Sequence, residues 1–362
     1  MRSAFFYNAK VKTWDVIVIG GGIIGLSLAI ELRKGGAQVL VVERGEPGRE
    51  ASHAAGGMLV DCSLETPSAL HSLATASARM YPEFVHELQD ESGTHVDLRD
   101  QGTLLFAGPE HDSQAAFARA IVSPEELSKL EPALTGAGLP ALFLKERSVD
   151  PRALTSAALK AAKHRGIDIS SGTAVTEVLS SDGRVSGVRT DKSTYSAPAV
   201  VNCAGAWAGQ IPPHQFPTRP RKGQMLDVVG GPVLSHVIRA PEVYLIPRSD
   251  GRIIIGATVE DAGFDKRTDS ETIRRLQQAA IRLVPALAHA RIHEAWAGLR
   301  PGTPDDLPIL GATKTPGYFV ATGHFRDGIL LAPVTARVMA QVIGGQEPEW
   351  DISAFSATRF ND

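Results

Sequence analysis

Cysteine is scarce in this sequence of 362 residues. Only Cys62 and Cys203 occur, and neither has a second cysteine or a histidine at a spacing typical of metal ligands or of a redox disulfide. The sequence therefore predicts no metal site and no disulfide framework. It favours the reducing environment of the cytoplasm, where free thiols persist.

The sequence also lacks an excess of charge of either sign. Lysine and arginine number 37 against 40 aspartates and glutamates, for a net charge of −3, and the basic residues form no cluster. Nucleic acids and anionic membrane surfaces attract proteins through clustered basic residues. Such partners are therefore not expected, and a small molecule is the expected partner.

No hydrophobic run has the length and the flanks of a membrane span. The most apolar stretch, residues 16–32, contains four glycines and is flanked by Asp15 and Glu31, which fits a buried strand followed by a helix. Residues 1–12 contain too short an apolar run for a secretory signal, so we expect a loose tail there.

The length exceeds the roughly 250–300 residues at which one hydrophobic core stops growing, so two domains are expected. The proline-rich stretch 211–220 is a candidate connector. Apolar runs typical of strands occur at 15–19, 38–43, 102–106, 185–188, 199–202, 225–229, 252–256 and 318–321. Helical patterns occur at 23–34, 152–165, 270–283 and 328–343. This mixture predicts an α/β protein with many short strands.

A glycine fingerprint follows the first apolar run. Gly20, Gly22 and Gly25 stand between a predicted strand and a predicted helix, where they allow a tight turn, close approach of a pyrophosphate and close helix packing. Glu43 ends the second strand, where its carboxylate can accept hydrogen bonds from ribose hydroxyls. The pattern predicts a dinucleotide site, and by itself it leaves FAD and NAD open.

Five further segments carry a family resemblance. They are 51–59 (ASHAAGGML), 201–207 (VNCAGAW), 244–248 (YLIPR), 296–303 (WAGLRPGT) and 323–333 (GHFRDGILLAP). In this order they resemble the amine oxidases of the D-amino-acid oxidase superfamily, most closely the glycine oxidases of thiamine biosynthesis. The resemblance covers nearly the whole chain. It implies an FAD bound without a covalent bond, because no cysteine stands in the C-terminal region where related sarcosine oxidases attach their flavin.

The resemblance implies an architecture and a set of cofactor contacts. The expected fold is a Rossmann-type FAD-binding domain (13–82, 148–217 and 295–362) with an inserted antiparallel-sheet substrate domain (83–147 and 218–294). The expected FAD contacts are Gly20, Gly22, Ile23, Ile24, Gly25, Glu43, Arg44, Ser52, Ala54, Ala55, Gly56, Gly57, Met58, Val175, Ala204, Gly205, Trp207, Arg300, His324, Arg326, Asp327, Gly328, Ile329 and Leu330.

Two of these segments also make chemical sense without the resemblance. Small residues at 51–57 would let the backbone lie against a flat ring system and offer its amides to flavin N5 and the pyrimidine edge. Gly328 is expected to open a helix whose N-terminal amides stabilise the negative charge that a flavin gains on reduction.

Three residues are candidates for substrate binding. Arg300 matches the family arginine that clamps the substrate carboxylate, although an ion pair with Asp305 or Asp306 is a structural alternative. Tyr244 matches the tyrosine that shares this carboxylate, and could instead be a core residue. Arg326 resembles an arginine near the flavin and the substrate entrance. His53 and His324 are interpreted as packing residues.

The implied reaction is oxidative deamination of glycine, sarcosine or small D-amino acids. A hydride would pass from the substrate Cα to flavin N5, the imine would hydrolyse, and oxygen would be reduced to hydrogen peroxide. The chain departs from the glycine-oxidase pattern at 241–243, which lack a histidine, and at Val259, which replaces a longer side chain. These changes leave the preferred amine open.

Alternatives remain at this point. The chain could be a D-amino-acid or secondary-amine dehydrogenase that passes electrons to a carrier, or a non-catalytic flavin-binding subunit of a complex. A tRNA-modifying oxidase is disfavoured because the sequence has no basic stripe. The family often forms homotetramers, so a homo-oligomer is expected.

Overall fold

The computed structural model describes residues 13–61, 66–106, 121–134 and 140–360. The expected N-terminal tail, 1–12, and Cys62 lie outside these ranges. Within the described ranges, no helix has both the length and the apolar character needed to cross a membrane.

A six-stranded sheet holds the glycine fingerprint. Its strand order is β19-β20-β13-β1-β2-β9, with all neighbours parallel except the antiparallel pair β19 and β20. The strands are β1 (Val16–Ile19), β2 (Val39–Val42), β9 (Asp168–Ser170), β13 (Ala199–Asn202), β19 (Ile309–Ala312) and β20 (Tyr318–Thr322). The predicted strand, glycine turn and helix at 15–34 are confirmed.

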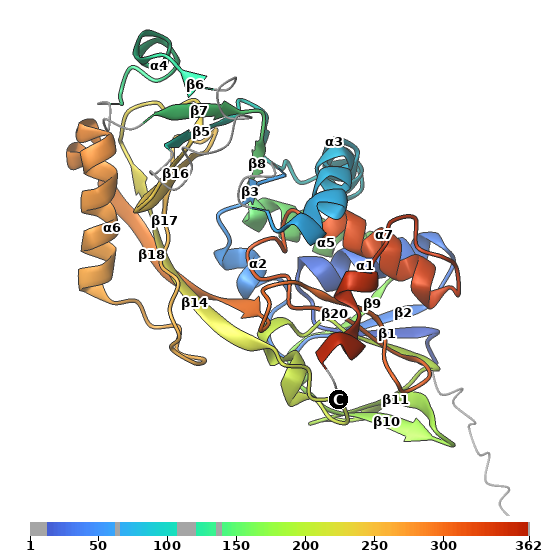
Figure 1. Cartoon of the computed structure of the whole chain (residues 1–362). Coiled ribbons are helices and arrows are strands. Elements are labelled where there is room, and N and C mark those ends of the chain that lie inside the picture. Colours follow the sequence, from blue (N-terminus) through green and yellow to red (C-terminus); the bar gives the residue numbers. More distant parts are fainter. Residues whose placement is uncertain (1–12, 62–65, 107–120, 135–139, 361–362) are drawn as a thin grey trace, which may run out of the picture.

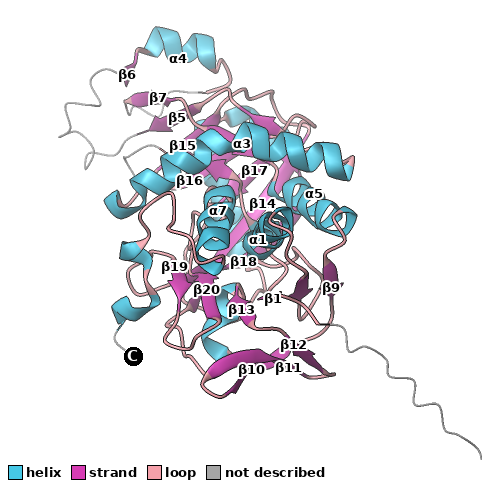
Figure 2. Cartoon of the chain, turned by 90° about the vertical axis from the view of Figure 1, so that its right-hand side faces the viewer, coloured by secondary structure: helices cyan, strands magenta, loops and turns pink. Residues whose placement is uncertain are grey.

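This sheet is buried on both faces, as parallel sheets usually are. Alternate residues of β1 point to opposite sides: Val16 and Val18 pack with the helices, whereas Ile17 and Ile19 pack with a small sheet. The helices are α1 (Ile23–Lys34), α3 (His71–Ser92), α5 (Pro151–His164) and α7 (Ala332–Ile343). The small sheet consists of β10 (Val175–Ser181), β11 (Arg184–Thr190) and β12 (Thr194–Ser196). Figure 2 shows the small sheet below β1 and β13.

An eight-stranded sheet forms the second body of the protein, at the left of Figure 1. Its order is β18-β14-β17-β16-β15-β5-β7-β6, and every neighbouring pair is antiparallel except β15 with β5. The strands are β5 (Thr103–Phe106), β6 (Ile121–Val122), β7 (Ala141–Leu144), β14 (Arg219–Val229), β15 (Val237–Ala240), β16 (Val243–Pro247), β17 (Ile253–Gly256) and β18 (Arg291–Gly302).

Helix α6 (Ser270–Leu283) covers one face of this sheet. Asp269 caps the helix by accepting a hydrogen bond from the Thr272 amide (2.8 Å), and the apolar side of the helix packs on Leu226 and Ile255. The opposite face carries Met225 and Ile254, which pack near Met58 of the first body. The face of the sheet opposite α6 therefore lies toward the first body.

Two long strands and several short elements join the bodies. β14 and β18 pair from Arg219 with Gly302 to Val229 with Arg291. The remaining described elements are α2 (Ala51–Ala54), α4 (Pro124–Leu130), β3 (Met58–Leu59), β4 (Leu98–Arg99), β8 (Arg147–Val149) and the 3₁₀ helices η1 (Ser68–Leu70), η4 (Gly205–Gln210), η5 (Pro285–His289), η6 (Ser353–Phe355) and η7 (Ala357–Phe360).

The fold class is confirmed as α/β with a Rossmann-type domain and a second, mostly antiparallel sheet. Three expected domain boundaries fall inside continuous elements: 82/83 in α3, 147/148 in β8 (Arg147–Val149) and 294/295 in β18. Val85 and Leu88, near the end of α3, pack in the same core as α1. We therefore propose that the whole of α3 belongs to the FAD-binding domain.

The C-terminal helix begins later than the sequence predicts. Residues 328–331 form a turn in which the Leu331 amide donates to the Asp327 carbonyl (2.8 Å), and α7 begins at Ala332 with Pro333 in its first turn. Gly328 therefore does not open the helix, which corrects the prediction.

Candidate active site

One cavity lies between the two sheets. Its volume is about 1120 Å³, and residues from both bodies line it. Single small-molecule pockets typically measure about 300–1,000 Å³, so this cavity can hold a dinucleotide together with a small second molecule. The carboxyl ends of β1, β2 and β13 open into it, which is where ligands bind in open α/β sheets.

Nearly all the predicted site residues line this cavity. They are Gly20, Gly22, Ile23, Ile24, Glu43, Arg44, Ser52, Ala54, Ala55, Gly56, Gly57, Met58, Val175, Ala204, Gly205, Trp207, Tyr244, Arg300, His324, Arg326, Asp327, Gly328 and Ile329. The two exceptions are Gly25 and Leu330. A Cβ at Gly25 would lie 2.0 Å from the Gly20 carbonyl oxygen, and Leu330 is 1% exposed. Both positions therefore serve packing around the cavity in this structure.

Glu43 organises the turn at the end of β1. Its Oε2 accepts a hydrogen bond from the Gly21 amide and its Oε1 accepts one from the Gly45 amide, both at 2.8 Å. A carboxylate has about four acceptor positions, so two remain for a ligand hydroxyl. Ser52 Oγ accepts a hydrogen bond from the Ile23 amide (3.0 Å), which connects α2 to the start of α1.

An aromatic and charged group borders the same end of the cavity. The Arg44 guanidinium lies 3.5 Å from the Trp207 ring centre and pairs with Glu50 (2.9 Å). Phe264 lies on a loop of the second body with its ring centre 5.1 Å from that of Trp207, and Lys266 of the same loop pairs with Glu50 (3.0 Å). The two bodies therefore meet beside Glu50 and Trp207.

The segment 54–57 forms the wall between the sheets. Ala54 lies against Gly298, where a Cβ would come within 2.3 Å of the Ala54 Cβ, and the Ala54 carbonyl accepts a hydrogen bond from Trp296 Nε1 (3.1 Å). Small residues on both sides thus permit the close approach of α2 and β18. This agrees with the expectation that backbone lines the cavity here.

Arg300 and Tyr244 meet in the cavity. Arg300 Nη1 donates to the Thr258 carbonyl (3.1 Å), and its guanidinium occupies the space beside Gly223. The Tyr244 ring packs against Gly256. Burial raises the pKa of Tyr244, while Arg300 and Arg326 oppose the rise. The hydroxyl therefore stays neutral, and it donates to Met225 Sδ (3.7 Å).

Arg300 does not form the ion pair weighed as its alternative role. Asp305 pairs with Arg359 instead (2.8 Å), and among the described residues no carboxylate lies within ion-pair distance of Arg300. A cationic fork in a cavity without an acidic partner is suited to a ligand carboxylate. This was the predicted role.

The segment 324–327 lies on the other side of the cavity. His324 is buried and its Nε2 contacts Thr335 Oγ1 (3.1 Å); burial lowers its pKa to about 3, so the ring is neutral at pH 7. Burial also raises the pKa of Asp327 to about 6, against the opposing effect of Arg326. His324 is thus a neutral, hydrogen-bonded residue that also lines the cavity, and its contact with FAD stays a prediction.

Several residues that shape or support the cavity were not predicted as site residues. Gly223 and Gly256 give Arg300 and Tyr244 their space, and Thr258 binds Arg300 through its carbonyl. From α3, Tyr81 donates to the Ile329 carbonyl (2.5 Å), supporting the wall from behind. Gly223 lies just before the predicted strand 225–229 and Gly256 ends the predicted strand 252–256, and a glycine at the edge of a strand pattern is a weak sequence signal.

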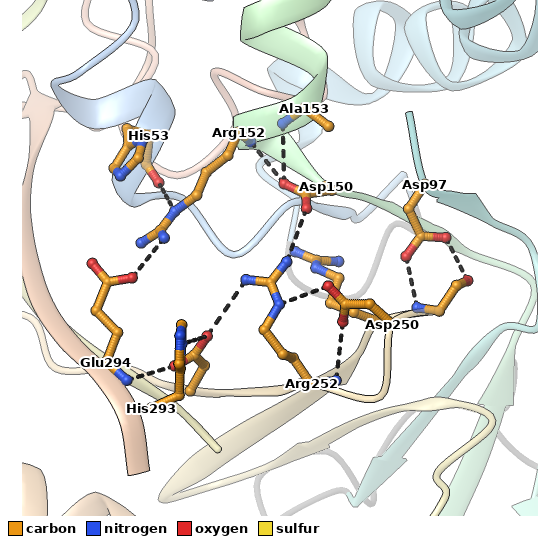
Figure 3. A network of polar contacts seen from close by, with 12 residues as sticks. His53, Asp97, Asp150, Arg152, Ala153, Asp250, Arg252, His293 and Glu294 are labelled. Carbon is orange, nitrogen blue, oxygen red and sulfur yellow. Dashed lines mark hydrogen bonds and ion pairs between the residues drawn. The ribbon is translucent and has the colours of Figure 1, made fainter. Parts of the chain in front are cut away.

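A polar network joins the two bodies outside the cavity. Figure 3 shows Arg152 reaching Glu294 and the carbonyl of His53, while Arg252 reaches Asp150 and Asp250. Asp227, His293 and Glu294 lie close enough together to suit a metal ion. Arg252 already pairs with Asp227 (3.4 Å) and Arg152 with Glu294 (2.7 Å), so we assign these acidic residues a structural role and not a metal-binding one.

Comparisons with known proteins agree with this geometry. Residues 15–342 match the family DAO, described as FAD dependent oxidoreductase. The chain is 34% identical to a glycine oxidase of Bacillus licheniformis, covering 96% of this chain and 98% of that protein. It is 37% identical to the bifunctional protein ThiO/ThiG of Trichormus variabilis. This match covers 96% of the present chain, which spans only 55% of that relative's length.

The crystal structure of glycine oxidase from Geobacillus kaustophilus superposes with a TM-score of 0.91 at 31% identity, covering 96% of this chain and 99% of that one. The match therefore includes both sheets. Family match and full-length relatives together establish the assignment, so this chain belongs to the DAO family of FAD-dependent oxidoreductases.

Proposed function

We propose that this protein catalyses the oxidative deamination of glycine and other small amines that carry a carboxylate. The observation that carries the proposal is Arg300, which faces the cavity beside the Tyr244 hydroxyl without an acidic partner among the described residues. The similarity to glycine oxidases supports the choice of substrate class.

The cavity residues fit FAD. Gly20 and Gly22 line the cavity at the start of α1, where a pyrophosphate can approach the backbone, and Glu43 keeps acceptor positions for ribose hydroxyls. The backbone of 54–58 and 326–329 would hold the ring system. When bound, FAD supplies the acceptor for the hydride that leaves the substrate Cα, and oxygen takes the two electrons to give hydrogen peroxide.

The chain's own residues orient the substrate. The Arg300 fork would bind the carboxylate through two parallel hydrogen bonds, and Tyr244 would donate a third from its neutral hydroxyl. These contacts fix the amine and the Cα–H bond relative to the wall of small residues, and such positioning accounts for much of the rate in reactions of this kind. Water then hydrolyses the imine to a 2-oxo acid and either ammonia or, from a secondary amine such as sarcosine, a primary amine.

An assay of oxygen consumption and peroxide release tests the proposal. Glycine, sarcosine, D-alanine and D-proline are the substrates, with L-alanine as the stereochemical control. Peroxide formed in proportion to oxygen consumed supports the oxidase. Reduction of an artificial dye without oxygen consumption would instead establish a dehydrogenase, and a bound flavin that no amine reduces would overturn the function.

We also propose that the protein forms a homo-oligomer and works in the cytoplasm. Light scattering measures the mass of the assembly in solution and so tests the first part.

A further inference from the structure

Arg248 is a buried cation directly behind the cavity wall. It follows β16 and is 5% exposed, and its Nη2 donates to the carbonyl oxygen of Gly56 at 2.5 Å. Its Nε and Nη1 are buried and have no hydrogen-bond partner among the described residues. A buried guanidinium with a single hydrogen bond is costly for folding, which calls for a compensating role.

The nearby carboxylates are engaged elsewhere. Asp97 binds Ser249, Asp150 caps α5 through the amides of Arg152 and Ala153, and Asp250 binds Arg252 (Figure 3). Burial lowers the pKa of Arg248, while Asp150 and Asp97 oppose this fall. Arginine stays protonated in proteins, so a positive charge without a contact ion pair is held at this place.

Gly56 connects this charge to the reaction centre. Both Gly56 and Gly57 line the cavity, and a Cβ at Gly56 would lie 3.5 Å from the Tyr244 ring. The Arg248 hydrogen bond draws electrons toward the Gly56 oxygen, which makes the Gly57 N–H of the same peptide a stronger donor. The guanidinium itself acts at short range through a medium of low polarity.

We propose that Arg248 is a positioning residue that sets the reduction potential of the bound flavin. A flavin gains negative charge on reduction, so a cation and a polarised amide at the wall favour the reduced form. The inference rests on the FAD site and holds for any substrate.

The test is the midpoint potential of the bound flavin, measured by dye-coupled reduction without any amine. Arg248→Gln keeps an amide donor for Gly56 but removes the charge, Arg248→Met removes both, and Arg248→Lys keeps the charge. We expect the Gln and Met variants to lower the potential by about 30 mV or more, equivalent to about tenfold in the two-electron equilibrium. The Lys variant should stay near wild type.

Arg252→Met is the matched control. Arg252 belongs to the same hairpin and pairs with Asp150, Asp227 and Asp250, but it is not part of the cavity wall. This variant should lower the unfolding temperature and leave the potential unchanged. Neutral Arg248 variants that bind FAD at the wild-type potential would overturn the proposal. So would loss of FAD from all three Arg248 variants, which would mark the residue as purely structural.

Because the potential is measured without substrate, its result is independent of the proposed amine specificity. An unreactive protein with a lowered potential in the Gln variant would support the role of Arg248 and overturn only the proposed function.

Discussion

The guanidinium of Arg300 fills the space that a side chain at Gly223 would take. A Cβ at Gly223 would lie 2.2 Å from Arg300 Nη1, and the two residues stand on the paired strands β14 and β18. The absence of a side chain on one strand therefore sets the position of a cation on the other.

Replacing Gly223 with alanine should displace Arg300 and weaken substrate binding without loss of FAD. We expect KM for the amine to rise about tenfold, the effect of about 1.4 kcal/mol. Steady-state kinetics on FAD-loaded protein measure it. Gly35→Ala, at the exposed end of α1, is the control and should leave KM unchanged. An unchanged KM in the Gly223 variant would refute the positioning of Arg300 by this strand.

Asp305→Asn should leave substrate kinetics unchanged and destabilise the fold. Asp305 pairs with Arg359 rather than with Arg300, so its charge holds the C-terminal segment to the strand end. Exposed and half-exposed pairs contribute up to about 1 kcal/mol. Chemical denaturation measures the loss. A raised KM in this variant would show that Asp305 helps to place Arg300 after all.

Glu43→Gln should weaken FAD binding. The glutamate accepts two backbone amides, and a glutamine oxygen cannot serve both positions, so one buried amide loses its acceptor. We expect a cost of about 1–3 kcal/mol, shared between folding and cofactor affinity. Titration of apoprotein with FAD gives the affinity. Glu46→Gln, which changes a largely exposed residue outside the cavity, should behave as wild type.

Asp327 should give the apoprotein a stability that depends on pH. Its folded pKa of about 6 lies above the ordinary value of 3.8, so the folded state holds a proton that the unfolded state releases between these values. Stability from this group is therefore lost as pH rises from about 4 to 6. The Asp327→Asn variant should lack this loss. Its stability relative to wild type should therefore increase from about pH 4 to 6 and stay constant at higher pH.

Denaturation of both apoproteins between pH 4 and pH 8, a range that brackets this titration, measures the difference. Parallel curves for wild type and Asp327→Asn would contradict the assignment of the raised pKa to Asp327.

The sequence predicted the elements whose pattern is local. β1 and α1 carry a β-branched run and a glycine turn, and α6 has a regular apolar face with Asp269 as its cap. The short segments that contain the small and charged site residues could likewise be recognised. Each segment is continuous in the sequence, and the segments follow one another in the order found in the family.

Features that depend on packing between distant segments could not be predicted. The buried side of α3 includes Ser77 and Ala78 and the helix contains Pro82, so its apolar periodicity is weak. Ser77 is buried because it donates to the Leu330 carbonyl (2.6 Å), a contact between residues far apart in the sequence. Arg248 stands in a recognised segment, yet its burial against Gly56 depends on how the two sheets meet.

The predicted start of α7 was wrong for a related reason. The apolar pattern continues through Ile329 and Leu330, but both residues are buried in a turn whose carbonyls bind α3. Hydrophobic periodicity reports burial and cannot distinguish a buried turn from the first turn of a helix.

The most direct test of the central claim is anaerobic reduction of the bound flavin by amine, in wild type and in Arg300→Ala. Glycine, sarcosine or a small D-amino acid should bleach the visible flavin absorbance of wild type, and air should restore it. The Arg300 variant should retain FAD and require about 10- to 100-fold more substrate for the same rate, since a charge-assisted hydrogen bond contributes about 1.5–3 kcal/mol. Equal reduction of both proteins would contradict the carboxylate-binding role of Arg300, and a wild-type flavin that no amine reduces would contradict the proposed function.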